Sequence, residues 1–142
     1  MDLTIPLENI TLNIRVAVLI RNRGGYILEE SKNGYCFPVG GRVKAGETSE
    51  EAAKREVFEE LGITVESLKL RGIVESFFGR NGDRVQEICF VYTASDVEGL
   101  ELSNEFAVYT LGQIESLDLR PHVIKEIIKS DSGTILHLVA KE

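Results

Sequence analysis

The 142-residue chain has few of the residues that form disulfides or zinc sites, with two cysteines and two histidines. Two cysteines are too few for a disulfide framework. Because neither Cys36 nor Cys89 lies near a histidine in the sequence, we interpret both as small packing residues. The histidines, His122 and His137, do not have the spacing of a zinc site or a nucleophilic triad, so we expect structural or exposed roles for both.

Long apolar runs and an excess of positive charge are also lacking. The apolar stretch over residues 16–20 is far too short to cross a bilayer, and no basic segment leads into a long apolar one at the start, so we expect a cytoplasmic protein without a membrane partner. The net charge is −7. This balance argues against binding a nucleic-acid polymer, which requires clustered Lys and Arg. A nucleotide substrate remains open because bound cations can reverse the local field.

The length suits one domain over residues 1–142, and the 43% apolar and 27% charged residues are ordinary for a globular protein. Runs of β-branched residues and turn signals predict strands, with Asn81-Gly82 as a hairpin turn. An apolar stripe at helical spacing follows Pro121, which can open a helix. We predict strands over residues 14–20, 26–30, 68–78, 85–94, 106–110 and 134–140, a short apolar piece over 35–39, and helical turns over 111–117. This order predicts an α/β fold with a mixed sheet between helices.

One helix is specified in more detail, over residues 49–61. Thr48 with Glu51 three positions later is a capping pattern, and Gly62 is a natural stop just past the helix end. Three glycines in the segment before it, at positions 40, 41 and 46, predict a loop over residues 40–46 whose backbone can approach a metal or a phosphate.

This helix carries three glutamates, Glu56, Glu59 and Glu60, within an arc of about 100°. A Glu-rich helix taken alone is more often a solvated surface with interleaved lysines. Here no lysine or arginine follows the cluster within the helix, and like charges at this spacing repel. A hard divalent cation with oxygen ligands would remove the repulsion, which favours Mg²⁺, with Mn²⁺ as a substitute.

Residues 41–63 read GRVKAGETSEEAAKREVFEELGI. This order matches every fixed position of the Nudix box, so the chain resembles a MutT-like Nudix hydrolase. The resemblance implies an α/β/α sandwich and hydrolysis of a diphosphate bond in a nucleoside diphosphate derivative, by water attack at phosphorus with divalent cations. Relatives usually carry Pro directly before Gly-Gly, whereas Val39 intervenes here. By position, the implied roles are metal binding for Glu56, Glu59, Glu60 and the carbonyl of Gly40, orientation of a glutamate for Arg55, and support of the loop for Glu47.

The substrate is less clearly indicated. Residues 78–81 lack the proline that marks ADP-ribose hydrolases and the tyrosine that marks diadenosine polyphosphate hydrolases, which leaves a (d)NTP or a nucleotide sugar. Glu56, Glu87 and Glu105 are candidates for the general base. Phe77 and Phe78 are candidates for a homodimer interface. The candidate substrate contacts are Arg15, Arg42, Tyr35, Phe37, Phe78, Glu87 and Glu105.

Two alternatives share the fold. A nucleotide-sensing Nudix-like module would bind nucleotide without turnover, although such sensors usually carry a DNA-binding segment for which this chain has no basic patch. An isopentenyl diphosphate isomerase would place its catalytic cysteine differently and is usually longer. Mass detection of products from nucleotides with Mg²⁺ separates these possibilities.

Overall fold

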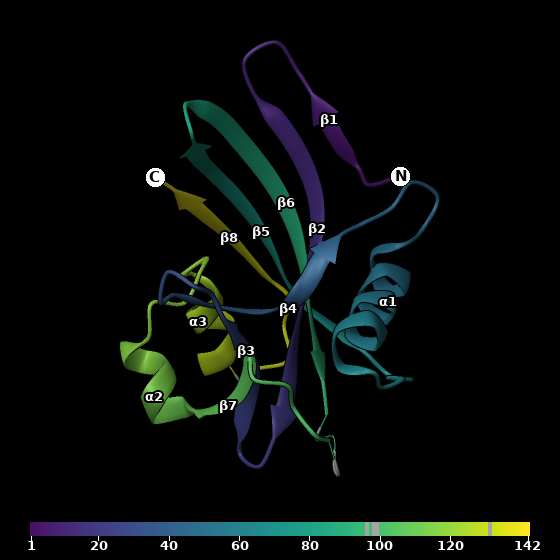
Figure 1. Ribbon diagram of the computed structural model, residues 1–142, viewed down its shortest axis with the longest axis vertical. Coiled ribbons are helices and arrows are strands. Elements are labelled where there is room, and N and C mark those ends of the chain that lie inside the picture. Colours follow the sequence, from purple (N-terminus) through teal and green to yellow (C-terminus); the bar gives the residue numbers. More distant parts are fainter. Residues whose placement is uncertain (96, 98–99, 131) are drawn as a thin grey trace.

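A curved mixed sheet organises the protein, with one long helix on one face and two short helices on the other (Figure 1). The computed structural model describes residues 1–95, 97, 100–130 and 132–142. Within them, no helix has the length and apolarity needed to span a membrane. The elements are β1 (Thr4–Pro6), β2 (Thr11–Asn22), β3 (Gly25–Glu30), β4 (Cys36–Arg42), α1 (Ser49–Leu61), β5 (Lys69–Arg80), β6 (Asp83–Ala94), β7 (Phe106–Thr110), α2 (Leu111–Ser116), α3 (Ile124–Lys129) and β8 (Leu136–Lys141).

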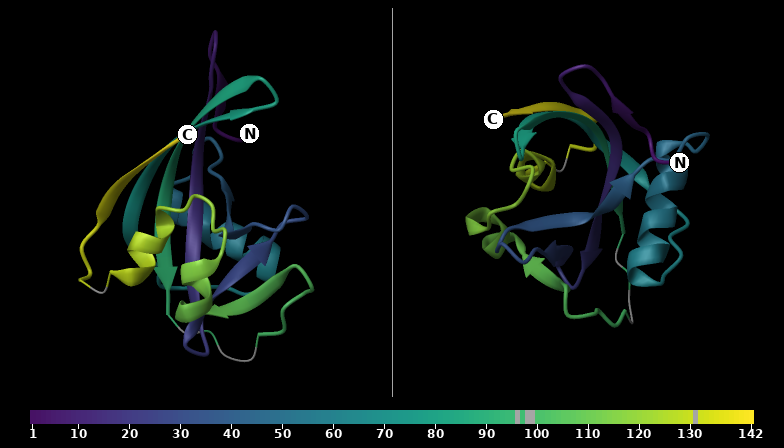
Figure 2. Two further views of the ribbon diagram at one scale, coloured as in Figure 1. Left: turned by 90° about the vertical axis from the view of Figure 1, so that its left-hand side faces the viewer. Right: turned by 45° about the horizontal axis from the view of Figure 1, so that its top comes forward.

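The strand order is β7-β3-β4-β2-β6-β5-β8, with β1 paired to the outer part of β2. The pairs β2–β6 and β5–β8 are parallel, and the other pairs are antiparallel. The long strands β5 and β6 bend strongly, as Figure 2 shows. In this order, the parallel pairing of β2 with β6 joins one part of the sheet, formed by β7, β3 and β4, to the other part, formed by β5 and β8.

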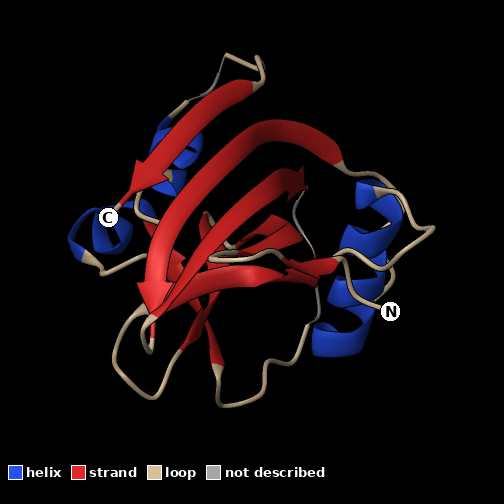
Figure 3. Cartoon of the chain, turned by 90° about the horizontal axis from the view of Figure 1, so that it is seen from above, coloured by secondary structure: helices blue, strands red, loops and turns tan. Residues whose placement is uncertain are grey.

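Strand β2 is buried on both faces and separates two cores. Val16 and Val18 pack in the core that contains Ala52, Ala53 and Val57 of α1. The alternate residues, Ala17 and Leu19, pack in the core that contains Ile124 and Ile127 of α3. Figure 3 shows the helices on the two sides of the strands. This arrangement confirms the predicted mixed sheet between helices.

Helix α1 has the predicted bounds because both of its ends are specified by local residues. The Thr48 hydroxyl accepts a hydrogen bond from the Glu51 N–H at 3.1 Å. Gly62 adopts a left-handed conformation with φ of 72°, and its N–H bonds to the Phe58 carbonyl. The Asn81-Gly82 hairpin is also confirmed, with positive φ at both residues.

The predicted loop over residues 40–46 is wrong in its first part. Gly40, Gly41 and Arg42 continue strand β4, where Gly40 pairs with Ala17 and Gly41 with Val16 of β2. Only Gly46 of the three glycines has a positive φ, at 87°. The extension follows from pairing with a strand more than twenty residues away, which local composition does not reveal.

The predicted start of the third helix is also wrong. Pro121 lies in a turn, and α3 begins at Ile124. The N–H groups of Ile124 and Lys125 bond to carbonyls three residues earlier, at Pro121 and His122. Tight turns of this type commonly lead into an α-helix, so the proline opens the turn instead of the helix. Strand β8 likewise starts at Leu136, two residues later than predicted.

Candidate functional site

The centre of the box is the guanidinium of Arg55 on α1. It donates two hydrogen bonds to the Glu47 carboxylate, at 3.0 and 2.7 Å. It also donates to Glu56 Oε1 at 2.9 Å and to Glu59 Oε2 at 3.3 Å, and its Nη2 bonds to the Arg42 carbonyl at 3.0 Å. One arginine therefore ties the end of β4, the loop and the glutamates of α1 together.

Glu47 and Arg55 stabilise each other's charged forms. The hydrogen bonds from Arg55 are the largest cause that lowers the pKa of Glu47 to about 2, and the Lys44 backbone N–H, at 2.8 Å from Glu47 Oε1, acts in the same direction. The Glu47 carboxylate in turn raises the pKa of Arg55. This geometry agrees with the orienting and loop-supporting roles that the resemblance implies for these two residues.

Glu60 is in a very different environment. Burial raises the pKa of its carboxyl to about 7, and the charges of Glu29 and Glu56 add to this rise. A hydrogen bond from the Gly40 backbone and the charge of Arg15 act in the opposite direction. The Oε2 atom is buried and has no hydrogen-bond partner among the described residues. A buried acid beside two other acids is an unfavourable arrangement that a bound cation would relieve.

Glu29, on β3, is a member of this acidic group that the sequence did not single out. Burial, and then the charge of Glu105, raises the pKa of Glu29. The register of β3 with β4 and β7 places Glu29 opposite Phe37 and Phe106. Its proximity to Glu60 depends on tertiary structure, and no local pattern signals it.

The two glycines at the end of β4 allow close approach. A Cβ on Gly40 would collide with the Val16 carbonyl of β2, and a Cβ on Gly41 would collide with the Glu56 carboxylate. The backbone of β4 can thus lie directly against the glutamates of α1. The Gly40 backbone also donates a hydrogen bond to the Glu60 carboxyl, so this part of β4 faces the acids of α1.

We expect Gly40→Ala to destabilise the fold, because its Cβ would meet backbone atoms of β2 that cannot move aside. The loss should be about 1–3 kcal/mol, the usual range for overpacking. Urea unfolding at neutral pH would measure it. Gly112→Ala is the matched control, because a Cβ at position 112 of α2 meets only the Thr110 hydroxyl at 4.0 Å. An equal response of the two variants would contradict the close-approach argument.

The oxygen donors of this site suit a hard divalent cation in type and charge. The buried, unpartnered Oε2 of Glu60 and the glycine-lined approach of β4 support the fit. In the part of the chain that the structure describes, no three His, Cys, Asp or Glu side chains form a ready-made ligand group. Arg55 contacts one oxygen of Glu56 and one of Glu59, Oε1 and Oε2 respectively, so the other oxygen of each carboxylate would serve a cation.

A cleft of about 710 Å³ opens beside the box, at Gly40 and Arg15. Of the seven candidate substrate contacts, the structure brings five to this cleft: Arg15, Tyr35, Phe37, Phe78 and Glu87. Arg42 instead lies 4.0 Å from Asp2. Glu105 is exposed near Glu29 and does not line the cleft.

Two part-buried aromatic rings of the cleft, those of Tyr35 and Phe78, are each contacted by an arginine. The Arg120 guanidinium lies 4.2 Å from the centre of the Tyr35 ring and forms an ion pair with Asp118 at 3.0 Å. Arg80 lies 5.7 Å from the Phe78 ring. Asp118 and Arg120 line the cleft but were missed from the sequence, because backbone bonds to Cys36 of β4 bring their segment there.

The floor of the cleft holds a polar group centred on Glu87 of β6. The buried Asn13 donates from Nδ2 to Glu87 Oε2 at 3.0 Å, and Arg15 Nε lies 3.9 Å from Glu87 Oε1. Asn13 was also missed from the sequence, where an isolated asparagine in a strand carries no signal. The hydrogen bond from Asn13 orients the Glu87 carboxylate and occupies one of its oxygens. Glu87 is therefore less suited to act as a general base than a carboxylate with both oxygens free.

The other polar and reactive residues lie apart from the box. Cys36 and Cys89 are buried and free, as predicted, and burial raises the pKa of the Cys89 thiol to about 12. His137 is exposed beside Glu75, and His122 is exposed at the cleft.

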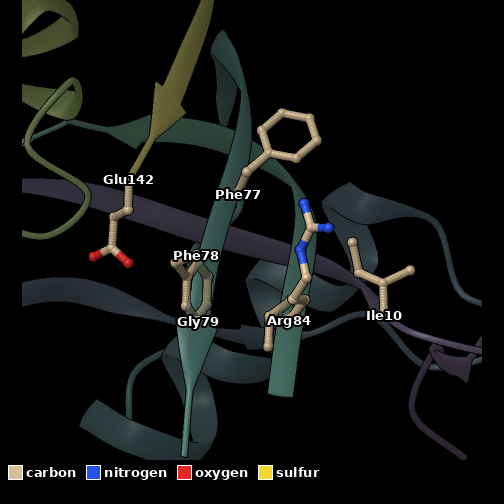
Figure 4. A pocket seen from close by; sticks show the side chains of 7 residues that line it. Ile10, Phe77, Phe78, Gly79, Arg84 and Glu142 are labelled. Atoms are coloured by element: carbon tan, nitrogen blue, oxygen red, sulfur yellow. The ribbon is translucent and has the colours of Figure 1, made fainter. Parts of the chain in front are cut away.

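A smaller pocket of about 130 Å³ lies near the β5–β6 hairpin (Figure 4). It shares Phe77, Phe78 and Glu142 with the cleft, and Figure 4 shows Ile10 and Arg84 on the other side of β5 from Glu142. No box glutamate lines either space, but the larger cleft is lined by Gly40 and Arg15, which both act on the Glu60 carboxyl. The larger cleft is therefore the candidate binding site.

Comparison with known proteins shows the family of the chain. A family model described as NUDIX domain matches residues 11–128. Nudix hydrolase 3 of Caenorhabditis elegans is 40% identical over 83 residues, which are 58% of this chain and 33% of that protein. The oxidized purine nucleoside triphosphate hydrolase of Danio rerio is 38% identical over 74 residues, which are 49% of this chain and 47% of that protein.

The matched region thus spans about a third to a half of these curated relatives. Among solved structures, a MutT protein from Bacillus halodurans is similar with a TM-score of 0.72 and 26% identity, over 88% of this chain and 86% of that chain. The family match covers most of the chain, including the box, the hairpin and both sides of the cleft. The chain therefore belongs to the Nudix domain family.

Proposed function

We propose that the protein is a divalent-cation-dependent pyrophosphohydrolase that cleaves a diphosphate bond of a small nucleotide by attack of water at phosphorus. The observation that carries this proposal is Glu60: its buried, unpartnered oxygen lies beside further acids, and Gly40 and Arg15, which both act on its carboxyl, line an open cleft. The names of two relatives, a Nudix hydrolase and an oxidized purine nucleoside triphosphate hydrolase, support it.

The box residues divide into ligands and supports. Glu56, Glu59, Glu60 and the Gly40 carbonyl would hold Mg²⁺, with Mn²⁺ as a substitute. When bound, the cation supplies charge neutralisation for the diphosphate and lowers the pKa of a coordinated water. Arg55 holds Glu56 and Glu59 at the α1 surface, and Glu47 holds Arg55 in place by a two-point contact.

The cleft residues would bind the rest of the nucleotide. Tyr35 and Phe37, whose rings lie 6.0 Å apart, offer a surface on which a base can stack. A cleft of this size is suited to a nucleotide-sized ligand. A (d)NTP or a nucleotide sugar is the substrate class we favour, and the oxidized purine nucleoside triphosphate in the name of the Danio rerio relative supports the first of these.

The test is a screen of nucleoside triphosphates, nucleotide sugars and dinucleotides with Mg²⁺, with products identified by mass spectrometry. We expect turnover of at least one nucleotide, release of a phosphorylated product, and loss of turnover in EDTA. Running the reaction in ¹⁸O-labelled water would show which phosphorus is attacked. Tight nucleotide binding without any product, in Mg²⁺ or Mn²⁺, would refute the enzyme and favour a sensing module.

A further inference from the structure

A buried asparagine stands out in strand β2. Asn13 is only 4% exposed, and its Oδ1 atom has no hydrogen-bond partner among the described residues. An unpaired buried acceptor lowers stability, so an apolar side chain would suit stability better. The amide does make one contact, from Nδ2 to Glu87 Oε2 at 3.0 Å. A side chain kept at such a cost points to a role for the contact it makes.

The register of the sheet makes this contact specific. The parallel pairing of β2 with β6 places Asn13 directly beside Glu87, and Arg15 two residues further along the same face of β2. The Glu87 side chain is 17% exposed and lines the cleft. With Oε2 bound to Asn13, the other oxygen, Oε1, lies 3.9 Å from Arg15 Nε. The amide thereby turns one carboxylate oxygen toward Arg15.

Arg15 is subject to two other charges. Its partner across the antiparallel β2–β4 pair is Arg42, a like charge that repels it. It is also close enough to α1 for its charge to counteract part of the rise in the pKa of Glu60. The Glu87 carboxylate attracts the same guanidinium from the cleft side.

We propose that Asn13 and Glu87 are positioning residues that hold the Arg15 guanidinium at the border between the cleft and the box, where it binds a phosphate group of the substrate. The Arg15 side chain is 34% exposed, so its guanidinium retains free N–H donors. The geometry of these donors matches that of phosphate oxygens. The ligand class is a diphosphate or longer phosphate chain. This inference rests on the proposed function, which places the phosphate chain of the substrate beside α1.

The test measures binding of inorganic pyrophosphate in Mg²⁺ by isothermal titration calorimetry. We expect Arg15→Ala to weaken binding by about tenfold or more, as for loss of a charge-assisted hydrogen bond. Asn13→Ala and Glu87→Gln should each weaken it by about three- to tenfold. In the Arg15→Ala background, either change should have an effect of about twofold or less, because the residues act through Arg15.

The matched control is Asn22→Ala at the other end of β2. Asn22 is also buried and donates from Nδ2 to a backbone carbonyl, that of Val97, but it lies outside the cleft. Its loss should leave pyrophosphate affinity unchanged. A merely structural Asn13 would behave like this control, or would add its full effect to that of Arg15→Ala, and either result overturns the proposal.

Folding of the variants does not limit the test. If Asn13→Ala fails to fold, the cycle of Glu87→Gln with Arg15→Ala decides by the same criterion. Absence of pyrophosphate binding to the wild-type protein also overturns the proposal. The binding measurement needs no turnover. A negative result in it is therefore distinct from a negative nucleotide screen, and a protein that binds pyrophosphate without hydrolysing nucleotides would still test the roles of Asn13 and Glu87.

Discussion

Glu60→Gln is expected to lower turnover on a verified substrate by at least about 100-fold and, at the same time, to stabilise the metal-free protein. The first effect follows because the glutamine lacks the charge that a divalent cation requires of its ligand. The second follows because burial of the charged Glu60 carboxylate is unfavourable and raises its pKa to about 7, whereas glutamine is neutral at every pH. Steady-state kinetics and urea unfolding in EDTA measure the two effects.

The stability gain should depend on pH in a defined way. A carboxyl whose pKa rises from 4.5 to about 7 on folding contributes stability that is fully present below pH 4.5 and is lost as the pH rises to 7. The variant and the wild type should therefore be equally stable near pH 4. At pH 8 the variant should be more stable by about 1–2 kcal/mol, a value reduced for the part of the carboxylate that stays in water.

Glu51→Gln is the control on the same helix, because Glu51 is exposed in the first turn and away from the cluster. It should change neither turnover nor the pH dependence. Near-normal turnover of Glu60→Gln would refute the metal assignment. A stability difference that is constant from pH 4 to pH 8 would refute the burial argument, and the two outcomes are independent.

Arg55→Ala should have the opposite effect on stability. Removing the guanidinium leaves Glu47, Glu56 and Glu59 without the group that holds all three. We expect a loss of about 2–3 kcal/mol, less than for a fully buried pair because the Arg55 side chain is 21% exposed. Turnover should fall by about 100-fold or more, since the ligands are no longer oriented. Urea unfolding and kinetics at saturating Mg²⁺ test both effects.

The pH dependence again has a definite sign. The Arg55 contact lowers the pKa of Glu47 to about 2, so its contribution is present above pH 4.5 and is lost as the pH falls to about 2. The stability difference between Arg55→Ala and wild type should shrink over that window. Arg55→Lys keeps the charge without the two-point contact and should recover stability only in part.

Lys54→Ala is the neighbouring control. Lys54 pairs with Glu50 at 3.4 Å, and the two side chains are 39% and 50% exposed. Such a pair contributes about 0.5 kcal/mol or less. A loss for Arg55→Ala no larger than that for Lys54→Ala would show that the arginine is not the centre of the site.

The predictions from sequence were accurate where the determinants are local. The ends of α1 follow from Thr48 and Gly62, which cap the helix within a turn of its ends. The Asn81-Gly82 turn follows from backbone angles that these two residues tolerate. The error at Gly40 arose because pairing with the distant strand β2 selected an extended conformation. At Pro121, bonds from the N–H groups of Ile124 and Lys125 to carbonyls three residues earlier form a tight turn ahead of α3.

The box residues could be predicted from local sequence, whereas the residues around the box could not. The spacing of Arg55, Glu56, Glu59 and Glu60 on one helix determined by itself that these groups share a surface, since helical geometry is fixed over so few residues. Tertiary structure alone decided that Glu29 approaches Glu60, that Arg120 covers Tyr35, and that Asn13 orients Glu87 toward Arg15. The reason is physical: those contacts depend on the register of paired strands and on a chain segment that returns to β4, and neither is encoded within a short stretch of residues.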